Sequence, residues 1–369
     1  MRTLFTAALL LMATIAPALT IKPTEQKEQL RFTLILSRHG VRPPLTPATA
    51  YSAQPWPEWE VPLGHLTPHG AEALRQMGTY LRQDLADRGL FSASGCPVQT
   101  AIYLYSDTDE RNISSSRATF RAFAPGCGPF PIHTVDPRIP DPLFRTTGLF
   151  PPPADGTYAR RAALRAEPQT VFSPESHAQL KLLSHILAPE PAHPAEKSIF
   201  GPSDKPPVDS TDIIAASRPR SIASEIVEDL LLEYLDDKPL AQVGWGRVDE
   251  STLRKLLPIR IATFNLEKRT PFFARMASSN MLDHILQTLD QAASKVVIPG
   301  ALGSPDTRLV YISGHDNDLA GIGGLLGLHW TADGNTDGTP PDSQIAFELW
   351  QRPGSRWPAR SFVPSEELV

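Results

Sequence analysis

The sequence predicts an α/β fold, because short apolar runs typical of buried strands alternate along the chain with segments of helical spacing. Three of these runs are FTLILS (32–37), AIYLYS (101–106) and RLVYIS (308–313). Their length, β-branched content and abrupt polar ends favour buried strands over helices. An alternation of this kind is typical of a sheet that is covered by helices.

Three stretches with helical spacing accompany these strands: 67–90, 112–123 and 317–328. The first is the clearest amphipathic helix, with Thr67 as its N-cap and Gly89 at its end. The second has Asn112 or Ser114 as its expected N-cap. The third carries small side chains that suit close packing.

The first twenty residues, MRTLFTAALLLMATIAPALT, have the features of a secretory signal peptide. Arg2 precedes an apolar run, and small residues surround an expected cleavage point near Ala18. A membrane anchor is the alternative, but the run is shorter than the roughly 20 apolar residues that a span needs. We therefore expect an exported protein, periplasmic or secreted, with no membrane association after signal cleavage.

The middle of the chain differs in character from the two ends. It contains mostly helical patterns, such as 222–235 and 278–296, interrupted by a proline-rich stretch (188–207) that we expect to be an exposed loop. We find no internal repeat. The expected organisation is a signal peptide (1–18), a discontinuous α/β core (19–150 and 297–369) and a mostly helical domain (151–296).

Composition narrows the classes of partner. The 369 residues are 41% hydrophobic and 20% charged, which suits an ordinary globular chain. The net charge of −5 and the lack of a long Lys/Arg run disfavour nucleic acids and anionic membranes, which need a broad basic surface. Any attraction for anions must therefore be local. The sequence does not indicate an oligomeric state.

Ionisable side chains gather directly after each predicted strand: Arg38, His39 and Arg42 in LSRHGVRPP (36–44), then Arg111, then His315 and Asp316. Ligands of open α/β sheets bind beyond the carboxyl ends of the strands, so these groups can converge on one pocket. Guanidinium groups match phosphate oxygens, and a neutral histidine among them is suited to attack phosphorus. The cations disfavour imidazolium and keep the lone pair of His39 free.

Each motif alone also has a structural interpretation. Arg-His-Gly is typical of a surface turn, and Arg111 could pair with a nearby aspartate. GHDND (314–318) resembles the start of a calcium-binding loop, but position twelve is Gly327 rather than the required glutamate. Cys96, Cys127 and the scattered histidines make a poor zinc set, so we expect neither metal nor cofactor. Export favours a disulfide over two buried thiols.

Taken together, the motifs resemble the histidine acid phosphatases, the second branch of the histidine phosphatase superfamily, and in particular bacterial periplasmic phytases and glucose-1-phosphatases. The resemblance runs from about Arg31 to Phe347 and rests on RHGVRPP (38–44), GHLTPHG (64–70), DTDER (107–111), IPDPLF (139–144), VGWGR (243–247), KRTPFFAR (268–275) and SGHDNDLAGIGGLLGLHW (313–330). It implies a three-layer α/β core like that of phosphoglycerate mutase, with a helical domain covering the site. It also implies a Cys96–Cys127 disulfide.

The same resemblance implies a role for each site residue. His39 would be the nucleophile and Asp316 the proton donor to the leaving alcohol. Arg38, Arg42, Arg111 and His315 would bind the phosphoryl group.

The sequence departs from the family pattern in three places. It reads His-Asp-Asn-Asp at 315–318, so Asp318 adds a negative charge that would raise the pKa of Asp316 if the two carboxyls lie close. Leu45 and Thr46 stand where bacterial phytases often place a lysine. The chain ends soon after AFELWQ (346–351), where relatives usually continue, so we expect one edge of the core to be incomplete.

The sequence thus predicts a secreted histidine acid phosphatase that hydrolyses phosphomonoesters, phytate or other small organic phosphates, through a phosphohistidine and without metal. An acidic pH optimum is expected. One alternative is a sugar-phosphate phosphatase of the glucose-1-phosphatase type. The other is a catalytically weak protein that binds phosphorylated ligands.

Overall fold

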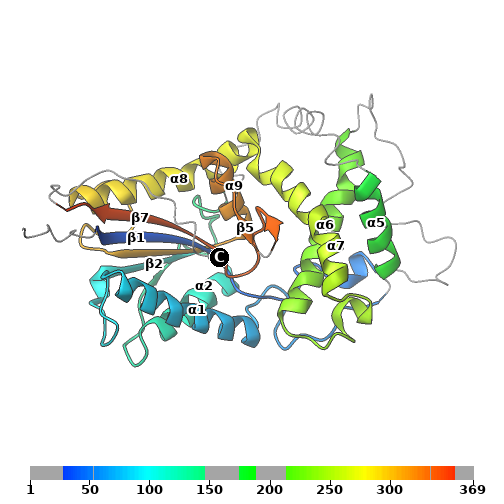
Figure 1. Ribbon diagram of the computed structural model, residues 1–369, viewed down its shortest axis with the longest axis horizontal. Helices are drawn as coiled ribbons and strands as arrows, with labels where there is room; N and C mark the ends of the chain where they lie inside the picture. The colour runs from blue at the N-terminus through cyan, green and yellow to red at the C-terminus, as the bar shows by residue number, and fades with distance from the viewer. Residues whose placement is uncertain (1–27, 53, 146–173, 188–212, 333, 354–369) are drawn as a thin grey trace, which may run out of the picture.

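A five-stranded sheet organises the computed structural model, which describes residues 28–52, 54–145, 174–187, 213–332 and 334–353 (Figure 1). The strands are β1 (Gln29–Arg38), β2 (Ile102–Ser106), β3 (Ile132–His133), β4 (Leu309–Gly314) and β7 (Gln344–Gln351). Their order is β3-β2-β4-β1-β7, with β7 antiparallel to β1 and the other pairs parallel. Strands β5 (Thr331–Ala332) and β6 (Asn335–Thr336) form a separate small sheet.

Helices cover both faces of the central sheet, which gives the three predicted layers. One face carries α1 (Pro68–Asp87) and α2 (Glu110–Phe123), and the other carries α8 (Pro271–Ser294) and α9 (Asp316–Leu326) (Figure 1). The α/β prediction is therefore confirmed.

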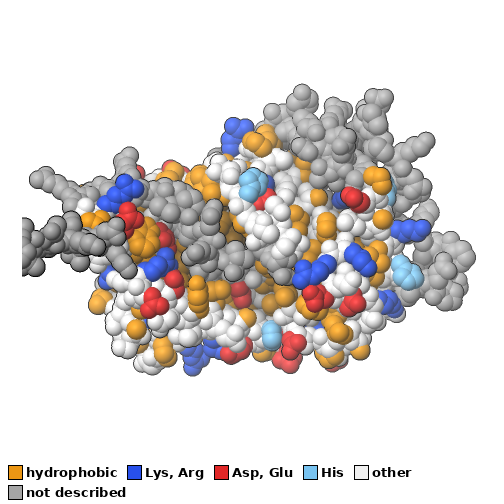
Figure 2. Space-filling view, in the orientation of Figure 1, with side chains coloured by type: hydrophobic (Ala, Val, Ile, Leu, Met, Phe, Trp, Pro, Cys, Tyr) orange, Lys and Arg blue, Asp and Glu red, His pale blue; other side chains and the backbone are white. Residues whose placement is uncertain are grey.

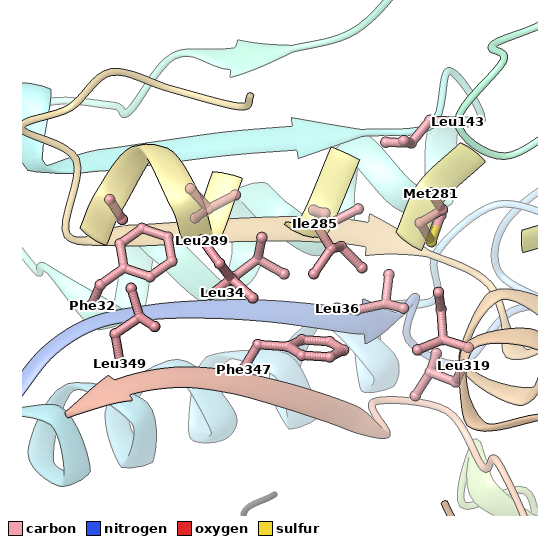
Figure 3. Close-up of a cluster of buried hydrophobic side chains, with 14 of the residues drawn as sticks. Phe32, Leu34, Leu36, Leu143, Met281, Ile285, Leu289, Leu319, Phe347 and Leu349 are labelled. Carbon is pink, nitrogen blue, oxygen red and sulfur yellow. The ribbon is translucent and has the colours of Figure 1, made fainter. Parts of the chain in front are cut away.

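A separate hydrophobic core fills each side of the sheet. On the α8 side, Phe32, Leu34 and Leu36 of β1 point toward Met281 and Ile285 of α8 (Figure 3). On the α1 side, Ile35 of the same strand packs with α1 and α2 residues. Alternate residues of β1 thus enter opposite cores, as the two-residue period of a strand requires.

A third group of helices lies beyond the carboxyl ends of the parallel strands (Figure 1). It contains α5 (Pro174–Leu187), α6 (Ile213–Leu235), the 3₁₀ turn η4 (Val243–Gly246) and α7 (Glu250–Phe264). Its own hydrophobic core includes Leu183, Ile226, Leu230 and Leu256. A π-helical turn, η5 (Asn265–Arg269), connects α7 to α8. Two further short 3₁₀ turns are η1 (Ala48–Ala50) and η2 (Gln99–Ala101).

The start of α1 agrees with the sequence prediction, whereas the starts of α2, α6 and α8 differ. Helix α6 begins at 213 rather than 222. Thr67 caps α1 as predicted, because its side chain accepts the N–H of Gly70. The predicted N-cap of α2 at Asn112 or Ser114 is wrong, since the helix begins at Glu110 and Arg111 lies in its first turn. Helix α8 begins at 271 rather than 278, with a proline in the first turn, where its missing N–H costs nothing.

Helix α8 also bears on the predicted division into domains. It lies inside the range expected for the helical domain (151–296), yet it packs on the sheet. The division itself stays a prediction. The expected signal peptide (1–18) and proline-rich loop (188–207) lie outside the described residues, and the expected gap at one sheet edge stays a prediction as well.

The Cys96–Cys127 disulfide is confirmed, with the two Cα atoms 5.5 Å apart. It joins the segment after α1 to the segment after α2.

Within the described ranges, none of the helices has both the length and the apolar character needed to span a bilayer. On the face shown in Figure 2, the Lys and Arg side chains that the structure describes are interspersed with Asp and Glu.

Candidate active site

Three strand ends bring the predicted site residues together. β1 and β4 end side by side at the Arg38–Gly314 pair, and β2 ends one register position earlier at Ser106. The N–H of His39 donates to the carbonyl of Gly314 over 3.0 Å. The side-chain amide of Asn112 donates to the same carbonyl over 2.8 Å. The turn after β1 and the first turn of α2 are therefore both fixed to the end of β4.

His39 is 2% exposed, and its environment defines its tautomer. Its Nδ1 lies 2.8 Å from the carbonyl oxygen of Gly40, which can only accept a hydrogen bond. Nδ1 therefore carries the proton, and Nε2 keeps its lone pair. Burial and the positive charge of Arg38 hold the pKa of His39 well below its usual range. A neutral imidazole with a free Nε2 is the form that a nucleophile requires.

The three predicted arginines lie around this imidazole and contribute to lowering its pKa. Arg38 is 1% exposed and pairs with Glu228, while Nη1 of Arg42 donates to the carbonyl of Pro43 over 2.9 Å. Arg111 binds Asp109 over 2.6 Å. Each of the three has a buried Nε with no hydrogen-bond partner among the described atoms. Three guanidinium groups around one neutral imidazole suit a site that binds an anion, because guanidinium donors match phosphate oxygens.

His315 faces His39 from the end of β4. Its ring centroid is 5.5 Å from that of His39, with the rings nearly perpendicular. Its Nε2 lies 2.6 Å from a carboxylate oxygen of Asp107, a residue that the sequence analysis did not assign. Burial opposes ionisation of Asp107, but the contact with His315 outweighs it and lowers the pKa of Asp107 to about 2. Asp107 therefore fixes the orientation of the His315 ring.

Asp316, the predicted proton donor, begins α9 and lies between two guanidinium groups. Its Oδ2 is 2.6 Å from Nη2 of Arg260 and 3.3 Å from Nη2 of Arg38. Burial raises the pKa of Asp316, but Arg38 and Arg260 outweigh burial and hold it well below its usual range. The carboxyl is thus ionised when the site holds no anion.

Comparison with known proteins decides the family. The sequence profile of the histidine phosphatase superfamily (branch 2) matches residues 29–149 and 270–363. The chain belongs to this family. The stretch between the two matched ranges contains α5, α6 and α7, and the second range begins at α8, the helix that packs on the sheet.

This histidine phosphatase has relatives of two named kinds. It is 32% identical to phytase AppA of Escherichia coli (strain K12), with 98% of this chain and 87% of the relative covered. It is 24% identical to a glucose-1-phosphatase of Salmonella typhimurium, with 91% and 80% covered. A solved structure of Hafnia alvei phytase with tartrate has a TM-score of 0.75 and 28% identity, and the match covers 91% of this chain and 84% of that one.

Two further charged residues of this histidine phosphatase come from the helical group and were missed in the sequence. Glu228 of α6 is 3% exposed and contacts both Arg38 and Arg260. Arg260 of α7 binds Asp316, as described above. Glu228 stands within the largely apolar stretch IVEDLLL (226–232), and a carboxyl among these apolar residues was the one sign in the sequence that it is buried. The sequence could not show that Glu228 contacts Arg38 and Arg260, because both lie more than thirty residues away in the chain.

Asp318 does not act as the sequence suggested. Its carboxylate accepts the N–H of His315 over 2.7 Å and so closes the first turn of α9. Burial raises the pKa of Asp318 itself to about 7. The pKa of Asp316 is lowered rather than raised, because two arginines face it.

Among the residues that the structure describes, one group of side chains has metal-ligating atoms within 4.8 Å of one another: Asp107, Asp109 and His315. Arg145 lies 2.8 Å from Asp109 and 3.3 Å from Asp107, and Arg111 also binds Asp109. Two guanidinium groups already neutralise these carboxylates and would repel a divalent cation. The cluster therefore suits the orientation of His315 better than metal binding.

Proposed function

We propose that this protein hydrolyses phosphomonoesters through a phosphohistidine formed on Nε2 of His39. The observation that carries the proposal is the neutral, buried His39, whose Nδ1 is bound by the Gly40 carbonyl while cationic arginines surround the ring. The cations bind the phosphoryl oxygens and leave the nucleophile unprotonated. Membership of the histidine phosphatase superfamily supports the same activity.

In the first step, Nε2 of His39 attacks phosphorus while Arg38, Arg42, Arg111 and His315 hold the phosphoryl oxygens. The P–N bond forms as the bond to the ester oxygen breaks, and Asp316 gives its proton to the leaving oxygen. In the second step, water attacks the phosphohistidine. The Asp316 carboxylate takes a proton from that water, and inorganic phosphate and neutral His39 are released.

Asp316 must carry a proton to act as an acid, although its pKa is low in the unliganded site. A bound phosphoryl group brings negative charge to Arg38, which faces Asp316 from 3.3 Å. That charge opposes the attraction that Arg38 exerts on the carboxylate, so protonation is easier in the complex. We therefore expect turnover to be fastest at acidic pH.

The substrates we propose are phytate and other small organic phosphates. The match to a phytase at 32% identity over 98% of the chain supports this choice. A sugar phosphate is the second candidate, supported by the glucose-1-phosphatase relatives.

We propose that the protein acts in the periplasm or outside the cell, since its N-terminus has signal-peptide features and Cys96–Cys127 is a disulfide.

The test is hydrolysis of p-nitrophenyl phosphate, phytate and glucose 1-phosphate with EDTA present. We expect turnover by the wild type and none by His39→Ala. After mixing with ³²P-labelled substrate, the protein should keep its label in an alkaline quench and lose it in acid, because phosphohistidine is acid-labile. An acid-stable label would overturn the assignment of His39.

A further inference from the structure

The loop 42–66 connects β1 to α1, and it begins and ends at the phosphoryl site. Its base is closed by a 3.0 Å hydrogen bond from the N–H of Thr67 to the carbonyl of Val41. In its first limb, the carbonyl of Pro43 accepts from Arg42. In its second limb, the carbonyl of Gly64 accepts from Nη1 of Arg111 over 3.4 Å. Two of the three site arginines therefore contact carbonyls of this one loop, and for Arg111 this long bond adds to its shorter pair with Asp109.

The middle of the loop is attached to the helical group. The indole rings of Trp56 in the loop and Trp245 in η4 stack almost in parallel, with centroids 5.3 Å apart. Each indole N–H is also used: Trp245 donates to the carbonyl of Pro55 over 2.7 Å, and Trp56 donates to that of Thr46 over 2.9 Å. The second bond joins the stack to the limb that carries Pro43.

The turn that presents Trp245 is built for this contact. Gly244, Trp245 and Gly246 all have positive φ, which is unfavourable for tryptophan. The buried carboxylate of Glu233 accepts the N–H of Gly244 over 2.8 Å and so secures the turn to α6. Arg247 completes the attachment, since it donates to the Ile186 carbonyl and to the Gln54 side chain. This turn is the VGWGR motif, which the catalytic steps above do not use.

We infer that Trp56 and Trp245 are positioning residues, whose stack fixes the loop 42–66 and thereby holds Arg42 and Arg111 at the spacing that a bound phosphoryl group needs. The inference rests on the proposed phosphatase function. Its physical basis is that a guanidinium bound to a loop carbonyl moves when that carbonyl moves. A displacement near 1 Å is enough to reduce an enzyme's rate about 10²-fold.

The test measures binding of inorganic phosphate by titration calorimetry, together with kcat and KM for p-nitrophenyl phosphate. Trp245→Ala should raise the Kd for phosphate and lower kcat/KM, each by about tenfold or more. Trp245→Phe keeps a stacking ring and should restore most of both values. The double variant Trp56→Ala/Trp245→Ala should lose less than the two single losses combined, because the stack is shared while each indole N–H makes a bond of its own.

Trp350→Ala is the matched control, since Trp350 is a half-buried tryptophan of β7, paired with Leu30 at the other end of β1 from the site. It should lower the melting temperature without changing the Kd for phosphate. An unchanged Kd in Trp245→Ala, with a similar loss of stability, would overturn the inference. If Trp245→Ala does not fold, Trp56→Ala carries the same comparison.

Calorimetry also separates this inference from the proposed function. A wild type that binds phosphate without hydrolysing esters would contradict the function while the comparison of variants still decides the inference. A wild type that does not bind phosphate would contradict both.

Discussion

The guanidinium groups of the site influence the protonation states of His39 and Asp316, the two side chains that we propose to react. Arg38 helps to keep His39 neutral, as a nucleophile requires, and it also favours ionised Asp316, which opposes the role of an acid. The sequence predicted the first effect, because Arg38 and His39 are neighbours in the chain. It could not predict the second in full, because Arg260 reaches Asp316 from α7.

Arg260 should therefore influence the pH above which Asp316 loses its proton and can no longer act as the acid. In Arg260→Met, Asp316 loses a cation, its pKa rises, and its proton is retained to higher pH. The alkaline limb of the pH–rate profile for an alkyl phosphate should move upward. p-Nitrophenyl phosphate, whose leaving group departs readily as an anion, should show little change. Arg260→Lys keeps the charge and is the control, and an unmoved limb in Arg260→Met would show that Arg260 does not govern Asp316.

At the scale of elements, the sequence predicted which segments form strands and helices but not where every helix begins. Asn112 has the chemistry of an N-cap, yet its side chain is used to bind the carbonyls of Ser313 and Gly314. The N-cap is Asp109, three residues earlier, and the helix begins at Glu110. A local pattern cannot show that a cap residue has a partner two hundred positions away.

Helix α8 shows that a local sequence pattern also cannot predict which surface a helix packs against. Its buried residues Met281, Ile285, Leu289 and Ala292 follow helical spacing, so the sequence predicted an amphipathic helix. The pattern identifies the face that is buried but not the surface that covers it. The helix was grouped with its neighbours in the chain, whereas its apolar face meets β1.

The contact between α1 and α2 should be sensitive to a single methyl group. A Cβ at Gly78 of α1 would overlap the backbone oxygen of Thr119 in α2. Alanine is favoured over glycine in a helix by about 1 kcal/mol, but overpacking costs about 1–3 kcal/mol, and a backbone atom cannot rotate away. Gly78→Ala should therefore lower the free energy of unfolding, measured with urea.

Displacement of α2 in Gly78→Ala should also lower kcat/KM, because Arg111 lies in its first turn. Gly128→Ala is the control, since the nearest atom to its Cβ would be 3.8 Å away. Equal free energies of unfolding in Gly78→Ala and Gly128→Ala would contradict the prediction, because they would show that α1 and α2 can move apart without loss of stability.

For the whole molecule, buried carboxyls set the pH range of stability. Burial raises the pKa of Glu233, Asp318 and Asp342 to about 7 each. Between their ordinary pKa values and pH 7, the folded state holds protons that the unfolded state has released. Stability therefore falls as pH rises through this window. His39 and Asp107 act in the opposite sense, because their pKa values are lowered in the folded state. The contribution of His39 is lost as pH falls below its ordinary pKa, and that of Asp107 only as pH falls from its ordinary pKa toward about 2.

We accordingly expect the melting temperature to be higher at pH 5 than at pH 8. Glu233→Gln mimics the protonated acid and can still accept the N–H of Gly244, so it should reduce this difference. Glu72→Gln is the control, because Glu72 is an exposed partner of Arg75 and its removal should leave the difference unchanged. A pH dependence of the same size in Glu233→Gln would contradict the role of Glu233.

The site is built from segments that the family profile matches and from a stretch between them that it does not match. His39 and Asp316, the proposed nucleophile and acid, belong to segments that the family profile matches, whereas Glu228 and Arg260 fall between the matched segments. Changes in the intervening stretch can therefore alter the acidity of Asp316 while His39 and Asp316 themselves stay unchanged. Chimeras that exchange residues 150–269 between relatives would inherit the chemistry of one parent and the pH response of the other.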